Sequence, residues 1–132
     1  TVALVVGFVL AGIAGAIHVY IWLLESVLWT RESTRRVFGV RSAEEAETLR
    51  PMAYNQGFYN LFLALGVLVG IVLGSTRDLR QAGIGVLVFA CLSMVLAAVV
   101  LLGSNRRMLR AALVQGALPL LALVALAVHL AG

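Results

Sequence analysis

Cysteine, lysine and charge are scarce in this sequence of 132 residues. Cys91 is the single cysteine, so no internal disulfide can form and the redox compartment stays open. Lysine is absent, and the ten basic residues are all arginine. The motifs Cys-x-x-Cys, His-Glu-x-x-His and Gly-x-Ser-x-Gly do not occur, and no glycine loop has phosphate-binding spacing. These absences argue against redox, protease and nucleotide-driven functions, and we expect no metal and no cofactor.

Apolar residues dominate the composition instead. They make up 62% of the chain, charged residues make up 12%, and the mean hydropathy is +1.04. A soluble domain of this size cannot bury so much apolar surface, so lipid must solvate part of it. A membrane-spanning helix needs roughly 20 mostly apolar residues, and such stretches lie at about 2–28, 52–74, 83–102 and 109–131. The sequence therefore predicts an all-α fold, with one domain over 1–132 built as a four-transmembrane-helix bundle.

The arginines are unevenly shared between the loops. Most lie in the first loop (30–51) or the third loop (103–110), whereas the second loop (75–82) holds only Arg77 and Arg80. Because cytoplasmic loops carry the excess of basic residues, we expect both termini to lie outside a bacterial cytoplasmic membrane that the chain crosses several times. The ten arginines that give the chain its net charge of +4 all lie in these loops. This charge therefore indicates contact with anionic membrane lipids rather than with nucleic acid.

The first loop carries a helix-start pattern. Ser42 and Glu45 have the spacing of a capping box, and Arg50 follows near the expected helix end. We therefore expect a short helix over about 43–50 at the cytoplasmic surface. Pro51 is expected near the start of the second span, where its missing N–H costs little.

Polar and aromatic side chains form a stripe on the first span. At about 100° per residue, His18, Trp22, Glu25 and Trp29 fall within an arc of about 60°. Small residues precede them on the same stripe. These are Gly7, Ala11, Ala14 and Gly15. One face of this span thus changes from small residues near the outside to polar and aromatic residues near the cytoplasm.

The second span shows the same change in the opposite chain direction. Its first part places Asn55, Gln56, Tyr59 and Asn60 within an arc of about 140°. Its second part carries Gly66, Gly70 and Gly74 at four-residue spacing. Small residues let helices approach closely, so we expect tight packing of the two spans in the outer half of the membrane. In the cytoplasmic half we expect a polar pocket, to which Gln115 of the fourth span contributes.

Each polar residue has a functional and a structural interpretation. Ionisable groups inside a membrane are by default functional-site hypotheses, so we interpret Glu25 and His18 as proton donor and acceptor. They lie about 10 Å apart along the helix axis and would flank one ligand. The residues interpreted as binding the substrate are Trp22, Asn55, Gln56, Tyr59, Asn60 and Gln115.

The structural interpretations are specific as well. Glu25 could pair with an arginine of the first loop, and His18 could hydrogen-bond Asn55 or Gln56 and so hold two helices together. Interhelical amide bonds of this kind are worth about 1 kcal/mol each. Trp29 is most simply an aromatic anchor at the membrane interface.

Two segments resemble a known family. They are HVYIWLLESVLWTRESTRRVFGV and EEAETLRPMAYNQGFYNLFLALG, which contain His18, Glu25, Asn55, Gln56, Gly57, Tyr59 and Asn60. The sequence is similar to the bacterial membrane family catalogued as domain of unknown function 1304. That resemblance implies a four-span fold over nearly the whole chain and implies little about activity.

Three function classes remain open. The first is a membrane enzyme that applies acid–base chemistry, isomerase- or hydrolase-like, to a small lipophilic or amphiphilic substrate. The second is a proton-coupled carrier or exporter, which could act as a homo-oligomer. The third is a binding or scaffold protein whose polar residues serve only structure. Sterol-isomerase-type membrane proteins also place His, Glu, Asn and Trp in a helical bundle, but this likeness is one of composition and not of sequence.

Overall fold

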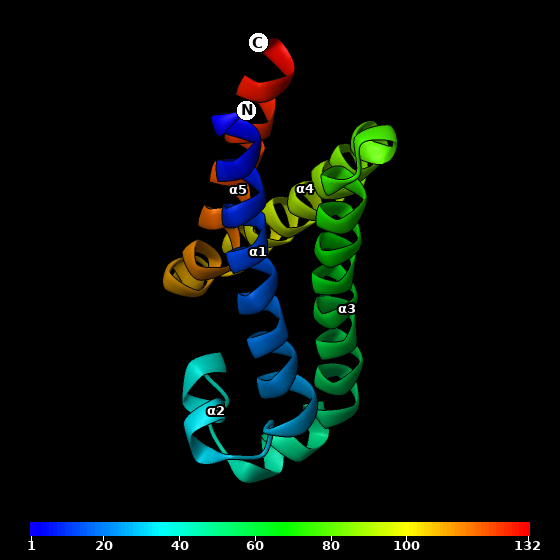
Figure 1. The fold of residues 1–132 in the computed structure, drawn as a ribbon. Helices are drawn as coiled ribbons and strands as arrows, with labels where there is room; N and C mark the ends of the chain where they lie inside the picture. Colours follow the sequence, from blue (N-terminus) through cyan, green and yellow to red (C-terminus); the bar gives the residue numbers. More distant parts are fainter. The chain divides into compact units, whose positions relative to one another are not determined.

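A computed structural model describes residues 1–132, and all its regular elements are helices (Figure 1). Four of the helices are long and one is short. In chain order they are α1 (Val2–Trp22), α2 (Glu32–Phe38), α3 (Ala43–Ser75), α4 (Arg80–Ser104) and α5 (Leu109–Ala131). Three single turns connect or extend them. These are the π-helical turn η1 (Leu23–Val27) and the 3₁₀ turns η2 (Arg77–Leu79) and η3 (Arg106–Met108).

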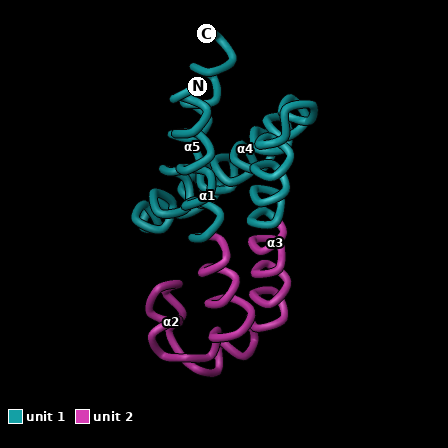
Figure 2. Tube along the Cα trace, in the orientation of Figure 1, with its two compact units in different colours: residues 1–17, 63–132 teal, residues 18–62 magenta.

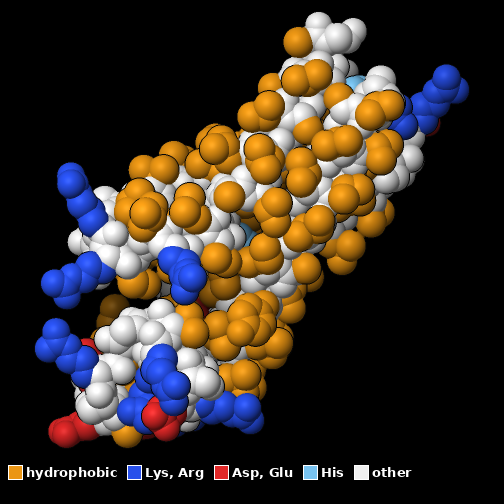
Figure 3. Space-filling view, turned by 90° about the vertical axis from the view of Figure 1, so that its left-hand side faces the viewer, with side chains coloured by type: hydrophobic (Ala, Val, Ile, Leu, Met, Phe, Trp, Pro, Cys, Tyr) orange, Lys and Arg blue, Asp and Glu red, His pale blue; other side chains and the backbone are white.

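Each long helix is apolar and long enough to cross a membrane. The candidate spans are Val2–Val27, Ala43–Ser75, Arg77–Ser104 and Arg106–Ala131. Hydrophobic side chains cover most of the face drawn in Figure 3, and the charged ones gather toward its margins. The predicted all-α fold class with four spans is confirmed.

The first loop does contain a short helix, but in a different place from the one expected. The separate helix is Glu32–Phe38, and it ends at Gly39, whose φ of 68° is left-handed. Val40 N donates to Arg35 O, which completes a Schellman cap. Residues 43–50, expected as an independent helix, instead form the first two turns of α3, and Pro51 lies inside that helix. Proline at this point removes one backbone hydrogen bond near the start of the helix without ending it.

The expected cap of that helix is present. Glu45 N donates to Ser42 Oγ over 3.1 Å, and Ala46 N donates to Ser42 O over 3.0 Å. The Glu45 carboxylate accepts from Arg41 N over 3.0 Å, one residue before the position that a standard capping box uses. Ser42 is thus the N-cap of the whole of α3.

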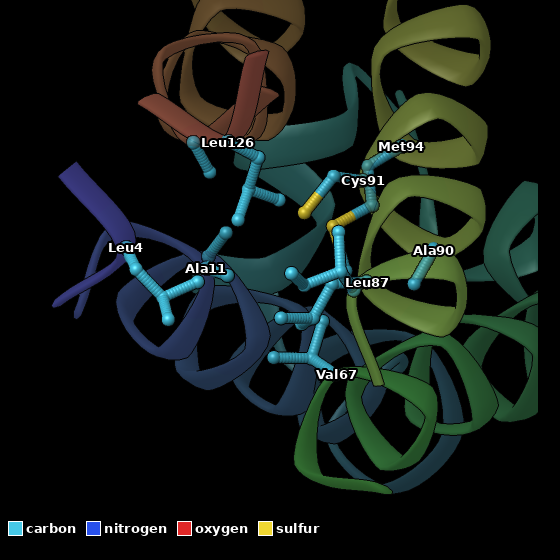
Figure 4. Packing of buried hydrophobic residues seen from close by; sticks show 11 residues of the cluster. Leu4, Ala11, Val67, Leu87, Ala90, Cys91, Met94 and Leu126 are labelled. Carbon is cyan, nitrogen blue, oxygen red and sulfur yellow. The ribbon is translucent and has the colours of Figure 1, made fainter. Parts of the chain in front are cut away.

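The chain forms two compact units, which Figure 2 colours separately. Unit 1 comprises residues 1–17 and 63–132, and unit 2 comprises residues 18–62. All four long helices contribute to the apolar core of unit 1 (Figure 4). That core is built from Leu4, Ala11, Ala14, Val67, Ile84, Leu87, Ala90, Cys91, Met94, Ala122 and Leu126.

Glycines allow close helix packing in unit 1. Between α1 and α3 this agrees with the packing expected from the sequence. A Cβ atom on Gly15 would lie 3.4 Å from Val67 Cγ1, and one on Gly74 would lie 2.7 Å from Phe8 Cζ. The other α3 glycines face α4 instead. A Cβ on Gly70 would lie 2.7 Å from Leu87 Cγ. The glycine series therefore serves two helix contacts, of which the sequence analysis anticipated one.

The closest helix approach in unit 1 is between α3 and α4. A Cβ atom on Gly83 would lie 2.6 Å from the carbonyl oxygen of Gly70 and would overlap the backbone of Gly74. Backbone atoms cannot move aside as a flexible side chain can. The α3–α4 crossing thus requires glycine at position 83.

Unit 2 has a small core of its own beneath the first loop. Trp29, Ala46 and Ala53 are buried there, and Trp29 Nε1 donates to Ala46 O over 2.8 Å. The Trp29 and Phe38 rings pack with their centroids 5.2 Å apart. Trp29 is therefore a buried core residue of unit 2, and its position at the membrane interface stays a prediction.

Candidate functional site

The candidate site lies in unit 2, where α1 gives way to the π-helical turn η1. Leu28 N donates to Leu23 O over 2.8 Å, which is an i to i−5 hydrogen bond. A turn of this kind inserts an extra residue and rotates the side chains that follow, and such turns frequently occur at functional sites. Glu25 lies in the middle of this turn. From this turn onward, the side chains of the polar stripe, Glu25 included, point in directions different from those expected for a regular α-helix.

Glu25 is buried and is held by one side chain of α3. Its exposed fraction is 8%, and Asn60 Nδ2 donates to Glu25 Oε1 over 2.6 Å. The Asn60 amide also donates to Gln56 O over 3.2 Å, which fixes the orientation of the amide. No arginine is involved, so the expected structural alternative of an ion pair with the first loop is wrong. A carboxyl group and an amide of unit 2 thus meet on the facing sides of α1 and α3.

Gly57 allows the two helices to approach at this point. A Cβ atom there would lie 3.1 Å from both Glu25 Cβ and Ser26 Cβ. Ser26 Oγ adds a second link, since it donates to Tyr54 O over 2.9 Å. The sequence analysis assigned no role to Ser26 or to the close approach at Gly57.

The sequence did contain a signal for this contact. Ala53, Gly57 and Asn60 are all buried and are spaced four and three residues apart. That spacing keeps residues on one helix face, and two of the three are small. Asn60 is thus the amide that shares a face with small residues, and such a face admits a neighbouring helix.

The other two polar residues of the α1 stripe are His18 and Trp22, which precede Glu25 in the chain. His18 is fully buried. The Trp22 ring packs edge-on against Phe58, with centroids 6.0 Å apart and an interplanar angle of 72°. Its indole Nε1 is buried and has no hydrogen-bond acceptor in the structure. A buried indole N–H ordinarily finds a partner, so Trp22 offers a donor for an acceptor group.

Several expected lining residues do not join this cluster. Asn55, Gln56 and Tyr59 are exposed on α3, and the exposed fraction of Tyr59 is 59%. The interpretation of His18 as a hydrogen-bonding partner of Asn55 or Gln56 stays a prediction. Gln115 is half-buried on α5 and belongs to unit 1. Of the residues expected to bind substrate, Asn60 contacts Glu25, and Trp22 packs on Phe58 of α3.

The donor set of the cluster does not suit a metal ion. The structure contains no group of three or more His, Cys, Asp and Glu side chains with metal-binding geometry. Unit 2 offers instead a carboxyl group bonded to an amide, with a buried imidazole and a buried indole N–H seven and three residues before the carboxyl in the chain. Such groups can exchange protons and hydrogen bonds with an organic ligand.

A comparison with protein families matches residues 12–127 to the family described as protein of unknown function DUF1304. The chain belongs to the DUF1304 family. The match includes every residue of unit 2, and the resemblance expected from the two sequence segments is confirmed. No curated protein and no solved structure matches the chain. This DUF1304 protein is a small multi-pass membrane protein with four candidate spans.

Proposed function

We propose that unit 2 of this DUF1304 protein binds a small lipophilic molecule and applies acid–base chemistry to it, as an isomerase or a hydrolase does. The observation that supports the proposal is the burial of Glu25 and its single hydrogen bond. This carboxyl group is buried in a candidate membrane span, with Asn60 donating to Oε1 and no protein donor to Oε2. An ionisable group is costly in such surroundings and usually marks a functional site.

The chemistry follows from the groups that surround the carboxyl. Asn60 holds Oε1 and so orients Glu25, which leaves Oε2 to exchange a proton with a ligand. His18, seven residues earlier on the same helix, is a second proton-transfer group. In an isomerisation Glu25 gives one proton and His18 takes one, so the ligand keeps its composition. The Trp22 indole N–H would donate to a carbonyl or hydroxyl oxygen of the ligand.

The proposal is tested by proton exchange with solvent. The purified protein would be incubated in deuterium oxide with a total bacterial lipid extract, and products would be detected by mass spectrometry. We expect a lipophile that gains deuterium with the natural protein and not with Glu25→Gln. Glu47→Gln is the matched control, because Glu47 is exposed and pairs only with Arg50. Equal labelling by Glu25→Gln, or no protein-dependent labelling at all, would contradict the proposal.

A proton-coupled carrier is the second candidate, because carriers also use a single carboxyl group buried in a span. It differs from an enzyme in moving protons across the membrane. In proteoliposomes with an imposed pH difference, a carrier would dissipate that difference when a membrane-impermeant quaternary ammonium ion is added, and Glu25→Gln would not. A non-catalytic scaffold would produce neither this signal nor deuterium labelling.

The orientation is part of the same proposal. Thr1 Oγ1 lies 2.7 Å from His129 Nδ1, which agrees with termini on one side of the membrane. Excess arginine in the α1–α3 connection and in η3 supports placing those segments in the cytoplasm and the termini outside. Alkaline phosphatase fused after Gly132 should then be active in a bacterial host. Activity of a fusion at Gly39 instead would reverse the orientation.

A further inference from the structure

A polar face of α3 points away from the candidate site. Met52, Asn55, Gln56 and Tyr59 are all exposed in unit 2. They fall within an arc of about 100° on the helix. The Asn60 and Gly57 side of the same helix faces α1. Unit 2 therefore leaves one face of α3 with side-chain amides and a phenol that nothing in the chain covers.

This face lies within the span. Arg50 is the last charged residue before a run without charge that extends to Thr76. Counting roughly 20 residues back from Ser75, the length that crosses the hydrocarbon core, reaches Gln56. Tyr59 is then inside the hydrocarbon and Asn55 is at its cytoplasmic edge. Polar side chains that enter the hydrocarbon from this edge lose their water and need hydrogen-bonding partners.

The exposed faces of α4 and α5 carry mainly hydrocarbon side chains. On α4 the large exposed side chains are Phe89, Leu92, Leu96, Val99 and Val100. On α5 they are Leu109, Leu113, Val114, Leu120, Leu121, Val124, Val128 and Leu130. Hydrocarbon side chains of this kind suit contact with lipid tails. Lipid tails cannot satisfy Asn55, Gln56 and Tyr59, so this part of α3 calls for a different neighbour.

We propose that this α3 face is the interface of a symmetric homodimer, with Asn55, Gln56 and Tyr59 meeting the same residues of a second copy. A side-chain amide is both donor and acceptor, so it can pair with its own copy across a two-fold axis. The face carries no charged side chain that would repel its copy. Polar side chains that bond across helices are a recurrent means of joining helices in membranes. The interface lies apart from Glu25, so it stands independently of the proposed chemistry.

Cysteine cross-linking in native membranes tests the interface. The single natural cysteine, Cys91, is fully buried, so the unsubstituted chain gives the background signal. Asn55→Cys and Tyr59→Cys should each form a disulfide-linked dimer on mild oxidation. Val114→Cys is the matched control. Val114 is exposed on α5 four residues after Arg110, and Asn55 is exposed on α3 five residues after Arg50. Each arginine is the last one in its helix before the apolar part of the span, and the proposed orientation puts both on the cytoplasmic side.

A second experiment removes the amide side chains from the proposed interface without introducing a disulfide. The double variant Asn55→Leu and Gln56→Leu should weaken dimerisation about tenfold or more in fluorescence-transfer titrations in liposomes, since each interhelical hydrogen bond contributes modestly. Leu113→Ala, on the lipid-facing side of α5, should leave the dimerisation constant unchanged. Cross-linking of the α3 variants at the level of Val114→Cys would overturn the proposal, as would a monomer at every protein-to-lipid ratio. Lipid headgroups would then be the partners of these amides.

Discussion

In the core of unit 1 the four long helices meet through apolar side chains and glycines, whereas in unit 2 the π-helical turn η1 meets α3 through hydrogen bonds. The tightest glycine contacts of unit 1 are those at Gly70, Gly74, Gly83 and Gly116. Those of unit 2 are the Asn60–Glu25 and Ser26–Tyr54 hydrogen bonds. The same two helices thus change their mode of contact along their length.

The two units differ in which kinds of side chain they bury. Apolar packing fixes helix positions, and the core of unit 1 holds no carboxyl or imidazole group. A buried carboxyl contributes little to stability by itself, because its desolvation opposes the bonds that it gains. Unit 2 therefore buries polar and ionisable side chains that the core of unit 1 lacks. We expect substitutions in unit 1 to disturb helix packing and substitutions in unit 2 to disturb hydrogen bonds.

The largest effect is expected at the α3–α4 crossing of unit 1. Gly83→Ala places a methyl group 2.6 Å from Gly70 O and against the Gly74 backbone, so the helices must separate. We expect a loss of about 3 kcal/mol or more in the free energy of unfolding, at the upper end for overpacking. Denaturation by increasing SDS fraction in mixed micelles would measure it.

The neighbouring glycine provides the control for that substitution. A Cβ atom on Gly85 would meet nothing within 4 Å. Gly85→Ala should thus be neutral or slightly stabilising, because alanine is the better helix former. Equal stability of the position 83 and position 85 variants would show that the crossing is looser than described.

A smaller effect is expected at the Glu25–Asn60 pair of unit 2. Asn60→Leu leaves Glu25 buried without its donor, which should cost about 1–3 kcal/mol. The double variant Glu25→Leu and Asn60→Leu removes both groups, and it should recover most of that loss. A double-mutant cycle from SDS titrations therefore gives a coupling energy for the pair. Additive losses in the cycle would mean that the two side chains do not interact.

The fold was largely predictable because membrane spans depend on composition. About 20 apolar residues suffice to identify a span, and arginine-containing loops separate each stretch from the next. The helix at 43–50 was misplaced because Pro51 was taken as a start signal. Proline prefers the first turn of a helix, but an interior proline outside the hydrocarbon loses only one backbone bond.

The site was predictable in part, for a geometric reason. Helical angles placed Glu25 and Asn60 on polar faces, and the structure joins them. An arc of about 140° is wider than one helix contact, however, so the residues within it could not all face α1. Only the side that also carries Gly57 does so. The π-helical turn changed the register after Trp22, and its local sequence LLESV contains no glycine or proline that would signal it.

The smallest effect is expected at the start of α3, where it tests whether residues 43–50 belong to the same helix as the span. Ser42→Ala removes the Oγ that accepts from Glu45 N, and a lost N-cap costs about 1 kcal/mol. Amide hydrogen exchange should accelerate over 43–50 and stay unchanged in the core of unit 1. Ser104→Ala is the control, since its hydroxyl bonds only to Leu101 O of its own helix. If exchange after Ser42→Ala stayed slow throughout, Trp29 and its bond to Ala46 O would hold the first turns of α3 in place of the cap.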